Sequence, residues 1–327
     1  MEPGLVEVIH GRHNPMIDGA HGMHVWGWEV PVYLFIGGMV AGATILLALY
    51  ELRFKEKPTS LSAQLVPWLL LPLMGIGLLA LLVDLEYPTH VYRFFLAFQP
   101  ASPMSWGGWL VLTVNAVWVA MGLGSLSATT QDWVLARSGP VAGVLRWAFD
   151  MGEAYRKPIL WTALAFGVGV GIYTGLLLGT LVARPPWNTA ILPPLFLTSG
   201  ISSGAALMLL MPLSDKEQHT FVRWDAAAMA IELVLIVVMV ISFVTGSAAD
   251  QAAGHVFLGG HHMPAFWAIV VGGGLIVPLL LAGFEIAKNR PLTRLSPVLV
   301  LIGGFTLRWI IVVAGQEASF ASLAMAH

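Results

Sequence analysis

The sequence predicts an all-α integral membrane protein in which eight transmembrane helices form two four-helix bundles, with both termini outside. Three observations predict this fold class: a composition with little charge, eight long apolar runs, and a one-sided distribution of Lys and Arg. Hydrophobic residues make up 57% of the 327 residues and charged residues 10%, and the mean hydropathy is +0.79. Since a soluble domain carries about 25% charged residues, the composition argues against a soluble enzyme, a disordered chain or a nucleic-acid binder.

Each apolar run is long enough to cross the hydrocarbon core as a helix, which takes about 20 residues. The runs are continuous and lack the period of two that is typical of β-barrel strands. The predicted spans are residues 28–50, 65–83, 105–127, 158–181, 190–212, 225–247, 264–287 and 296–314. They divide the chain into an outer N-terminal segment (1–27), a first four-helix bundle (28–181) and a second one (182–327). The N-terminal segment lacks the apolar run of a cleavable signal peptide.

The loops carry Lys and Arg in strict alternation, which predicts the orientation. Of the 16 Lys and Arg residues, twelve fall in the loops after the first, third, fifth and seventh spans, and three fall on the opposite side. Because cytoplasmic loops are enriched in Lys and Arg, these four loops should lie inside and both termini outside. The longest of them, 128–157, mixes Trp, Leu and Val with Arg and predicts an amphipathic helix at the cytoplasmic interface.

An internal repeat is visible at an offset of 162 residues. The first span contains the GxxxG pair Gly38 and Gly42, and the fifth contains Gly200 and Gly204. The same offset carries the second span onto the sixth and the third onto the seventh, but it fails at the fourth. Both GxxxG helices run from outside to inside, so the pattern indicates a parallel repeat of two bundles. The alternative is ordinary packing, because GxxxG pairs are common wherever membrane helices approach closely.

Histidine and cysteine usage restricts the redox chemistry that this protein can carry. None of the ten His residues lies in a predicted span, so the His pair that holds haem between membrane helices is absent. The sequence has no Cys, which excludes disulfides, thiolate zinc sites and cysteine-ligated iron–sulfur clusters. We therefore expect no haem, cluster or metal in this chain. We interpret the His residues of the outer segments as polar loop residues on a solvated surface. The alternative is a metal site formed by His21, His24, His261 and His262.

Four ionisable side chains gather in the outer half of the predicted membrane. Glu29 and Tyr33 share one face of the first span because they are four residues apart. Asp84 closes the outer end of the second span, and Tyr173 lies in the outer half of the fourth. An acid and a phenol beside an apolar cleft suit a quinone, whose ring carbonyls need hydrogen-bond donors and whose reduction consumes protons. Two alternatives stay open. In one, Tyr33 and Tyr173 are aromatic residues of the membrane interface and Glu29 is simply solvated. In the other, the protein is a transporter that uses intramembrane carboxylates.

Five phrases of the sequence stand out together and span nearly the whole chain. They are 28–42 (WEVPVYLFIGGMVAG), 84–88 with 98–107 in an outer loop, 173–175 (YTG), 199–206 (SGISSGAA), and Arg308 with 314–316 (AGQ). In this order, they resemble the NrfD / polysulfide reductase membrane-subunit family.

The resemblance implies a haem-free helical bundle with a quinone site near the outer surface of the first four-helix bundle. The matching positions are Glu29, Tyr33 and Tyr173, which would bind menaquinone or ubiquinone as an exchangeable ligand. Glu29 would exchange the proton, and Asp84 is a further candidate for proton exchange. Polysulfide reductase has Asn and His on its first helix where this chain has Glu and Tyr, so the ligand geometry and the proton donor stay open.

The resemblance also implies partners in a prokaryotic cytoplasmic (inner) membrane. A ferredoxin-like iron–sulfur subunit would dock on the outer face, with a molybdopterin catalytic subunit beyond it. The protein would be the membrane anchor of a respiratory oxidoreductase complex and would exchange electrons and protons between that partner and the quinone pool. One alternative is a proton- or ion-translocating subunit, with or without quinone redox coupling, whose path would use Glu232, Glu285 and Arg308. Another is an inert anchor that binds no quinone.

Overall fold

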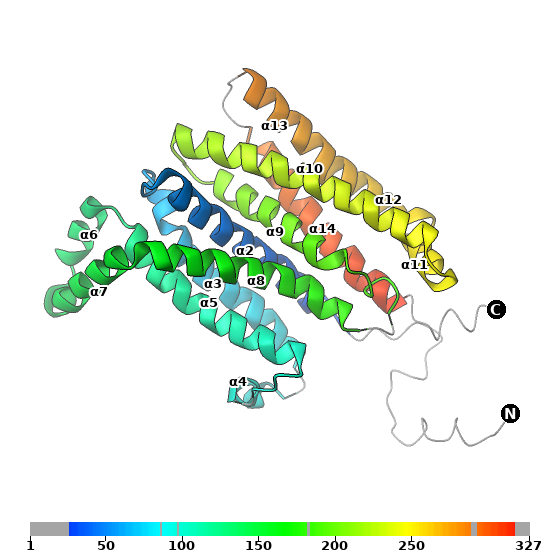
Figure 1. The fold of residues 1–327 in the computed structure, drawn as a ribbon, viewed down its shortest axis with the longest axis horizontal. Helices are drawn as coiled ribbons and strands as arrows, with labels where there is room; N and C mark the ends of the chain where they lie inside the picture. The colour runs from blue at the N-terminus through cyan, green and yellow to red at the C-terminus, as the bar shows by residue number, and fades with distance from the viewer. Residues whose placement is uncertain (1–25, 86, 97, 182–183, 289–292, 318–327) are drawn as a thin grey trace.

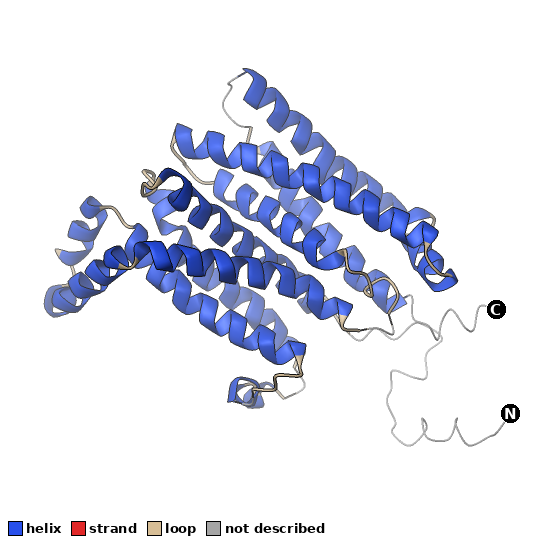
Figure 2. Ribbon diagram, viewed as in Figure 1, coloured by secondary structure: helices blue, strands red, loops and turns tan. Residues whose placement is uncertain are grey.

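A computed structural model describes residues 26–85, 87–96, 98–181, 184–288 and 293–317. These residues form helices joined by loops, and no strand occurs among them (Figure 2). Within them, eight helices are long and apolar enough to cross a membrane, which confirms the predicted number of spans. The protein is therefore a multi-pass membrane protein.

The spanning helices lie side by side along one common direction (Figure 1). A helix of 23 residues is about 35 Å long, enough to cross a hydrocarbon core of about 30 Å. The spans are α2 (Glu29–Phe54), α3 (Leu61–Asp84), α5 (Pro103–Ser125), α8 (Arg156–Gly179), α9 (Leu192–Leu209), α10 (Asp215–Thr245), the seventh span formed by α12 (Met263–Ala265), η3 (Phe266–Ile276) and α13 (Val277–Lys288), and α14 (Leu295–Glu317).

Two spans differ from the sequence-based prediction. The helix α10 begins at Asp215 rather than near residue 225, because Ser214 and Glu217 form a capping box in which the Ser214 amide donates to Glu217 Oε2 at 2.9 Å. The seventh span contains a π-helix, η3, at the run of glycines 272–274. A π-helix is rare and frequently marks a functional site.

Short helices occupy the connections. The amphipathic helix expected within 128–157 is present as α6 (Ala128–Leu135) and α7 (Ala142–Ala154), with the turn η2 (Gly139–Val141) between them. Figure 1 shows this pair projecting beyond one end of the spanning helices. At the opposite end lie η1 (Pro88–His90), α4 (Tyr92–Leu96) and α11 (Ala248–Leu258).

The helix α2 lies at the centre of the structure and packs most extensively on α9. The crossing uses both GxxxG pairs. A Cβ at Gly42 would overlap the carbonyl of Gly200, and a Cβ at Gly204 would overlap the backbone at Ala43. A Cβ at Gly200 would in turn lie 2.6 Å from the carbonyl oxygen of Gly38. Since the pairs ascend together along both helices, α2 and α9 run in the same direction.

The other helices repeat one pattern of neighbours. The helices α2 and α5 each pack on α3 and on α8, whereas α9 and the seventh span each pack on α10 and on α14. Extensive contacts also join the two sets, chiefly through α2, α8, α9 and α14. The boundary between two bundles at 181–182 and the outward position of both termini stay predictions.

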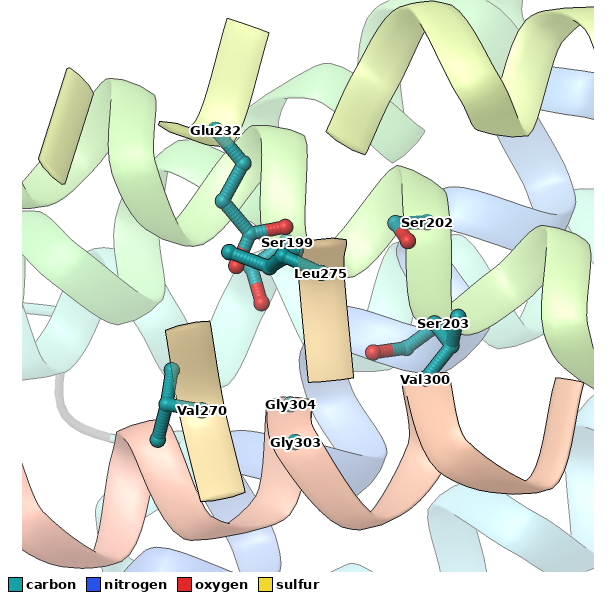
Figure 3. A pocket seen from close by; sticks show the side chains of 9 residues that line it. All are labelled: Ser199, Ser202, Ser203, Glu232, Val270, Leu275, Val300, Gly303 and Gly304. Atoms are coloured by element: carbon teal, nitrogen blue, oxygen red, sulfur yellow. The ribbon is translucent and has the colours of Figure 1, made fainter. Parts of the chain in front are cut away.

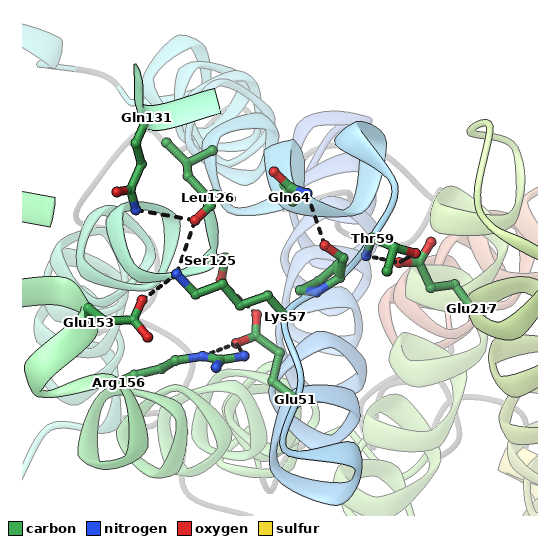
Figure 4. Close-up of polar contacts among 11 residues, drawn as sticks. Glu51, Lys57, Thr59, Gln64, Ser125, Leu126, Gln131, Glu153, Arg156 and Glu217 are labelled. Atoms are coloured by element: carbon green, nitrogen blue, oxygen red, sulfur yellow. Dashed lines mark hydrogen bonds and ion pairs between the residues drawn. The ribbon is translucent and has the colours of Figure 1, made fainter. Parts of the chain in front are cut away.

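Polar side chains tie the helices together at the predicted cytoplasmic end (Figure 4). The buried carboxylate of Glu51 on α2 accepts hydrogen bonds from Ser125 Oγ at 2.7 Å and Arg156 Nε at 2.9 Å. This connects α2, α5 and α8. Lys57 forms an ion pair with Glu153 and donates to the Leu126 carbonyl at 3.1 Å, which holds α7 beside the end of α5.

A second set of polar contacts ties the helices at the opposite end. The Trp26 amide donates to Gln316 Oε1 at 2.8 Å, and Gln316 Nε2 donates back to the Trp26 carbonyl at 3.1 Å. Trp187 stacks on Trp26 with ring centroids 5.1 Å apart. Arg184 donates to the carbonyls of Gly315 and Gln316. The start of α2 is thereby fixed to the end of α14.

The close packing of α2 on α9 at their glycines predicts that a large side chain there destabilises the protein. We expect Gly42→Leu to lower the melting temperature of the purified protein, since overpacking typically costs about 1–3 kcal/mol. The matched control is Gly75→Leu on α3, where an added Cβ meets open space. Thermal unfolding followed by tryptophan fluorescence checks this, and equal melting of the two variants would contradict the crossing.

The absence of Cys makes the orientation testable by single-cysteine labelling. Ala136 follows α6 and Ala248 begins α11, and both are exposed at opposite ends of the spans. We expect a membrane-impermeant maleimide to label Ala248→Cys in intact spheroplasts and to label Ala136→Cys only after permeabilisation. The reverse result would invert the predicted topology.

Candidate functional site

Glu29 is the first residue of α2 and lies half-buried at the helix N-terminus. This end favours a carboxylate, because the first N–H groups and the helix dipole are positive there. The side chain folds back over Gly27, where an added Cβ would overlap Glu29 Oε2. Oε2 is buried and has no hydrogen-bond partner among the described residues. Such an oxygen is costly to leave unpaired, so it is available to a ligand.

Tyr33 lies one turn further along α2, and Tyr173 reaches it from α8. Only 7% of Tyr33 and 8% of Tyr173 is exposed, and the two side chains lie close enough to interact electrostatically. Neither hydroxyl makes a hydrogen bond within the described part of the protein. Because a buried Tyr hydroxyl usually finds a partner, the pair presents two free donors in apolar surroundings.

Two glycines lie against these phenols. At Gly107, near the start of α5, an added Cβ would overlap the ring and hydroxyl of Tyr173, so no larger residue fits there. At Gly77 on α3, an added Cβ would lie 3.5 Å from the Tyr33 ring. The phenol pair is therefore enclosed by α2, α3, α5 and α8, which are the four spans of the predicted first bundle.

Asp84 is the last residue of α3 and is exposed. Its carboxylate lies close enough to Glu29 for the two charges to repel. The structure thus gathers the four predicted residues into two pairs: the carboxylates Glu29 and Asp84 at the helix ends, and the phenols Tyr33 and Tyr173 deeper in the bundle. No hydrogen bond joins the two pairs among the residues that the structure describes.

Exposed aromatic rings surround this end of the bundle. In the outer loop, Phe98 and Trp106 meet edge to face with centroids 5.0 Å apart, and Trp106 Nε1 donates to the Pro100 carbonyl at 2.8 Å. Tyr87 and Tyr92 are also exposed. Aromatic rings with a polar edge are typical of the boundary between lipid and water.

A second polar group lies where α14 meets α2 and α9. Arg308 is fully buried, and its guanidinium donates to Leu34 O at 3.1 Å, Phe196 O at 3.2 Å, Gly304 O at 2.9 Å and Ser199 Oγ at 3.0 Å. A charge at this depth is costly unless its donors are paired. Here three backbone carbonyls and one hydroxyl provide the pairing.

Glu232 belongs to the same polar group. It is buried, hydrogen-bonds with Ser199 and interacts with the charge of Arg308. The predicted span 225–247 puts Glu232 close to its inner end. The structure places it in the middle of α10, because this helix begins earlier than predicted. On the same helix, buried Asp225 accepts a hydrogen bond from Ser202 Oγ at 2.9 Å. Figure 3 shows Ser199 and Glu232 together.

Glu285, the third member of the alternative translocation path, lies elsewhere. Its Oε1 accepts from the amide and the hydroxyl of Thr293, at 2.8 and 2.9 Å. This contact connects the end of α13 to the segment before α14.

Among the residues that the structure describes, no three His, Asp or Glu side chains lie close enough together to bind one metal ion. His261 and His262 lie side by side, with ring centroids 3.8 Å apart. The other two members of the candidate metal set, His21 and His24, lie outside the described residues.

Sequence reasoning missed several residues that shape these sites. Gly107 carries no chemical signal, although it lies in one of the family phrases, and Gly77 has no signal at all. Asp225 was overlooked because the apolar run appeared to begin at that residue. The serines 199, 202 and 203 were visible only as small residues of the GxxxG phrase.

Comparisons with known proteins give a consistent result. The family model "Polysulphide reductase, NrfD" matches residues 18–319. The C chain of polysulfide reductase from Wolinella succinogenes is 31% identical over 313 residues, covering 89% of this chain and 94% of the relative. Protein NrfD of Escherichia coli is 30% identical over 309 residues, covering 89% and 95%. The C subunit of selenate reductase from Mesobacillus selenatarsenatis is 24% identical over 321 residues, covering 90% and 74%.

The family match extends over nearly all of the sequence, and two of these relatives share at least 30% of their residues with it. All eight spans described above fall within the matched region. The chain belongs to the NrfD polysulphide reductase family.

Proposed function

We propose that this protein is the haem-free, quinone-reactive membrane anchor of a respiratory oxidoreductase complex. It exchanges electrons and protons between the membrane quinone pool and an iron–sulfur partner subunit. The observation that carries the proposal is the convergence of Tyr33 and Tyr173, with free hydroxyls, beneath the unpartnered carboxylate oxygen of Glu29.

The residues fit menaquinone or ubiquinone, used as an exchangeable ligand. A bound quinone supplies the two-electron, two-proton chemistry that the side chains of this protein lack. Tyr33 and Tyr173 would hold the quinone by donating hydrogen bonds to its ring oxygens, and Gly107 lets the Tyr173 ring lie close to α5. Their apolar surroundings exclude water and strengthen each hydrogen bond.

Glu29 and Asp84 act as the route for protons. Both lie at the ends of their helices, between the phenol pair and the aqueous phase that we predict to be outside. Glu29 holds the proton at Oε2, which has no other partner among the described residues, and passes it to exposed Asp84. A positioned carboxyl group of this kind contributes about 10²–10⁴-fold to a proton-transfer step.

Electrons come from a partner, because a protein without Cys cannot hold a cysteine-ligated cluster. Several relatives are named as the C component of a polysulfide, selenate or tetrathionate reductase. These names support a multi-subunit complex here too. The family resemblance leads us to propose its parts: a ferredoxin-like iron–sulfur subunit on the outer face, a molybdopterin catalytic subunit beyond it, and a location in the prokaryotic inner membrane. The exposed side chains of Tyr87, Tyr92 and Leu96 offer that partner an apolar surface.

Substitutions at the candidate site should lower the rate of quinol oxidation, whereas a similar substitution elsewhere in the bundle should not. In the purified complex, we expect Glu29→Gln to lower quinol oxidation about 100-fold, since it removes the proton carrier. We expect Tyr173→Phe to lower it about tenfold, since a lost hydrogen bond costs about 1–1.5 kcal/mol. Stopped-flow oxidation of menaquinol and ubiquinol measures both rates.

The matched control is Tyr50→Phe, which changes the same kind of side chain on α2 at the opposite end of the bundle. Its rate should equal that of the unmodified complex. Unchanged turnover in both site variants would remove the site assignment. Quinone extracted in stoichiometric amount from the purified complex would exclude the inert anchor, which binds no quinone and only tethers its partner.

A further inference from the structure

The backbone just before α2 is held by a side chain from the last spanning helix. Gln316 lies in the final turn of α14 and is only 2% exposed. Its Oε1 accepts a hydrogen bond from the Trp26 N–H, and its Nε2 donates one to the Trp26 carbonyl. Because the oxygen and the nitrogen of a Gln amide have different roles, this pair of bonds allows one orientation of the side chain. Gln316 therefore fixes the position of Trp26 and does not merely cover it.

Two residues between α8 and α9 hold the end of α14 in turn. Arg184 Nη1 donates to the Gln316 carbonyl at 2.6 Å and to the carbonyl before it at 3.1 Å, where a helix has no partners of its own. Trp187 is 2% exposed, donates from Nε1 to the Ile311 carbonyl at 2.7 Å, and stacks on Trp26. We call the four residues Trp26, Arg184, Trp187 and Gln316 the Gln316 cluster.

The Gln316 cluster adjoins the candidate site along the chain. Trp26 is followed by Gly27, and the side chain of Glu29 folds back over this glycine, where an added Cβ would overlap Oε2. The same oxygen is the one without a hydrogen-bond partner among the described residues. The backbone that Gln316 fixes therefore leads directly into the surface against which the Glu29 carboxylate lies.

The start of α2 has little local support of its own. Its N-cap residue, Trp28, makes no side-chain capping hydrogen bond, and an uncapped helix start depends on other contacts to stay in place. Beyond the site, the Leu34 carbonyl accepts from Arg308 Nε at 3.1 Å. The last helix thus contacts the chain on both sides of the segment that carries Glu29 and Tyr33, at points eight residues apart on each segment.

We infer that Gln316 is a positioning residue for the proposed quinone site. Through the backbone of Trp26 it holds the start of α2 and keeps Glu29 Oε2 in the place from which it exchanges the proton. The inference rests on the proposed function, in which Glu29 carries that proton. It adds that a site enclosed by α2, α3, α5 and α8 needs the end of α14 to be complete. Gln316 itself contacts neither the quinone nor the proton.

A double-mutant cycle of Gln316 and Glu29, measured as menaquinol and ubiquinol oxidation by the purified complex, tests this inference. We expect Gln316→Ala to lower kcat about tenfold with little change in KM, since misplacing a reacting group by about 1 Å can cost about 100-fold. Glu29→Gln already lowers the rate about 100-fold, and in that background Gln316→Ala should add little, because the two residues act as a unit. A double variant about 1,000-fold slower, the product of the single effects, would overturn the inference.

A conservative variant keeps the test valid if Gln316→Ala folds poorly. Gln316→Glu retains an oxygen that accepts from the Trp26 N–H and loses the donor to the Trp26 carbonyl. We expect it to lower kcat less than Gln316→Ala does, and again with little further effect in the Glu29→Gln background. The matched control is Gln251→Ala, an exposed Gln at the same end of the bundle that donates to the Gly246 carbonyl. Its rate should equal that of the unmodified complex.

Hydrogen–deuterium exchange over residues 26–34 gives a readout that needs no quinol. Exchange should be faster in Gln316→Ala than in Gln251→Ala, and equal exchange would overturn the inference. An unchanged rate in Gln316→Ala, with Glu29→Gln slow, would overturn the inference and leave the proposed function standing. An unchanged rate in Glu29→Gln would overturn both, even if exchange over this segment is faster.

Discussion

The close crossing of α2 and α9 is the contact on which the other features depend. In hydrocarbon there is little hydrophobic force between helices, so association relies on tight van der Waals packing and on small residues. The two GxxxG pairs supply such packing, and α2 becomes the most enclosed of the spans. With α2 at the centre, its start can meet α3, α5 and α8 around the phenols. The residue after Tyr33, Leu34, can meet α14 at Arg308.

The spans could be predicted from sequence because a lipid core requires long apolar runs, whatever the tertiary packing. Their ends could not be predicted so well, since caps decide them. The helix α10 extends beyond its predicted span to Asp215, because Ser214 and Glu217 pair there, in a segment that hydropathy classifies as a loop. The π-helix left no trace in hydropathy either, because its register is a property of backbone hydrogen bonds.

Of the candidate site, the face shared by Glu29 and Tyr33 followed from helical spacing, and Tyr173 followed from a family phrase. The approach of Tyr33 to Tyr173 depends on how α2 and α8 pack, which no local pattern encodes. For the same reason the roles of Gly107 and Ser199 can be recognised only in the assembled bundle. Gly107 leaves space for the Tyr173 ring. Ser199 lies between Glu232 and Arg308.

The burial of Arg308 has an electrical consequence. A charge held within the low-dielectric layer lies inside the field that an energised membrane sets up. Carrying a full charge across that layer takes about 2.3 kcal/mol per 100 mV. Displacement of the guanidinium along the membrane normal, or of an ion that arrives beside it, is therefore coupled to the membrane potential. The hydrogen bonds that fix Arg308 to Leu34 and Phe196 hold this charge at a set depth in the field.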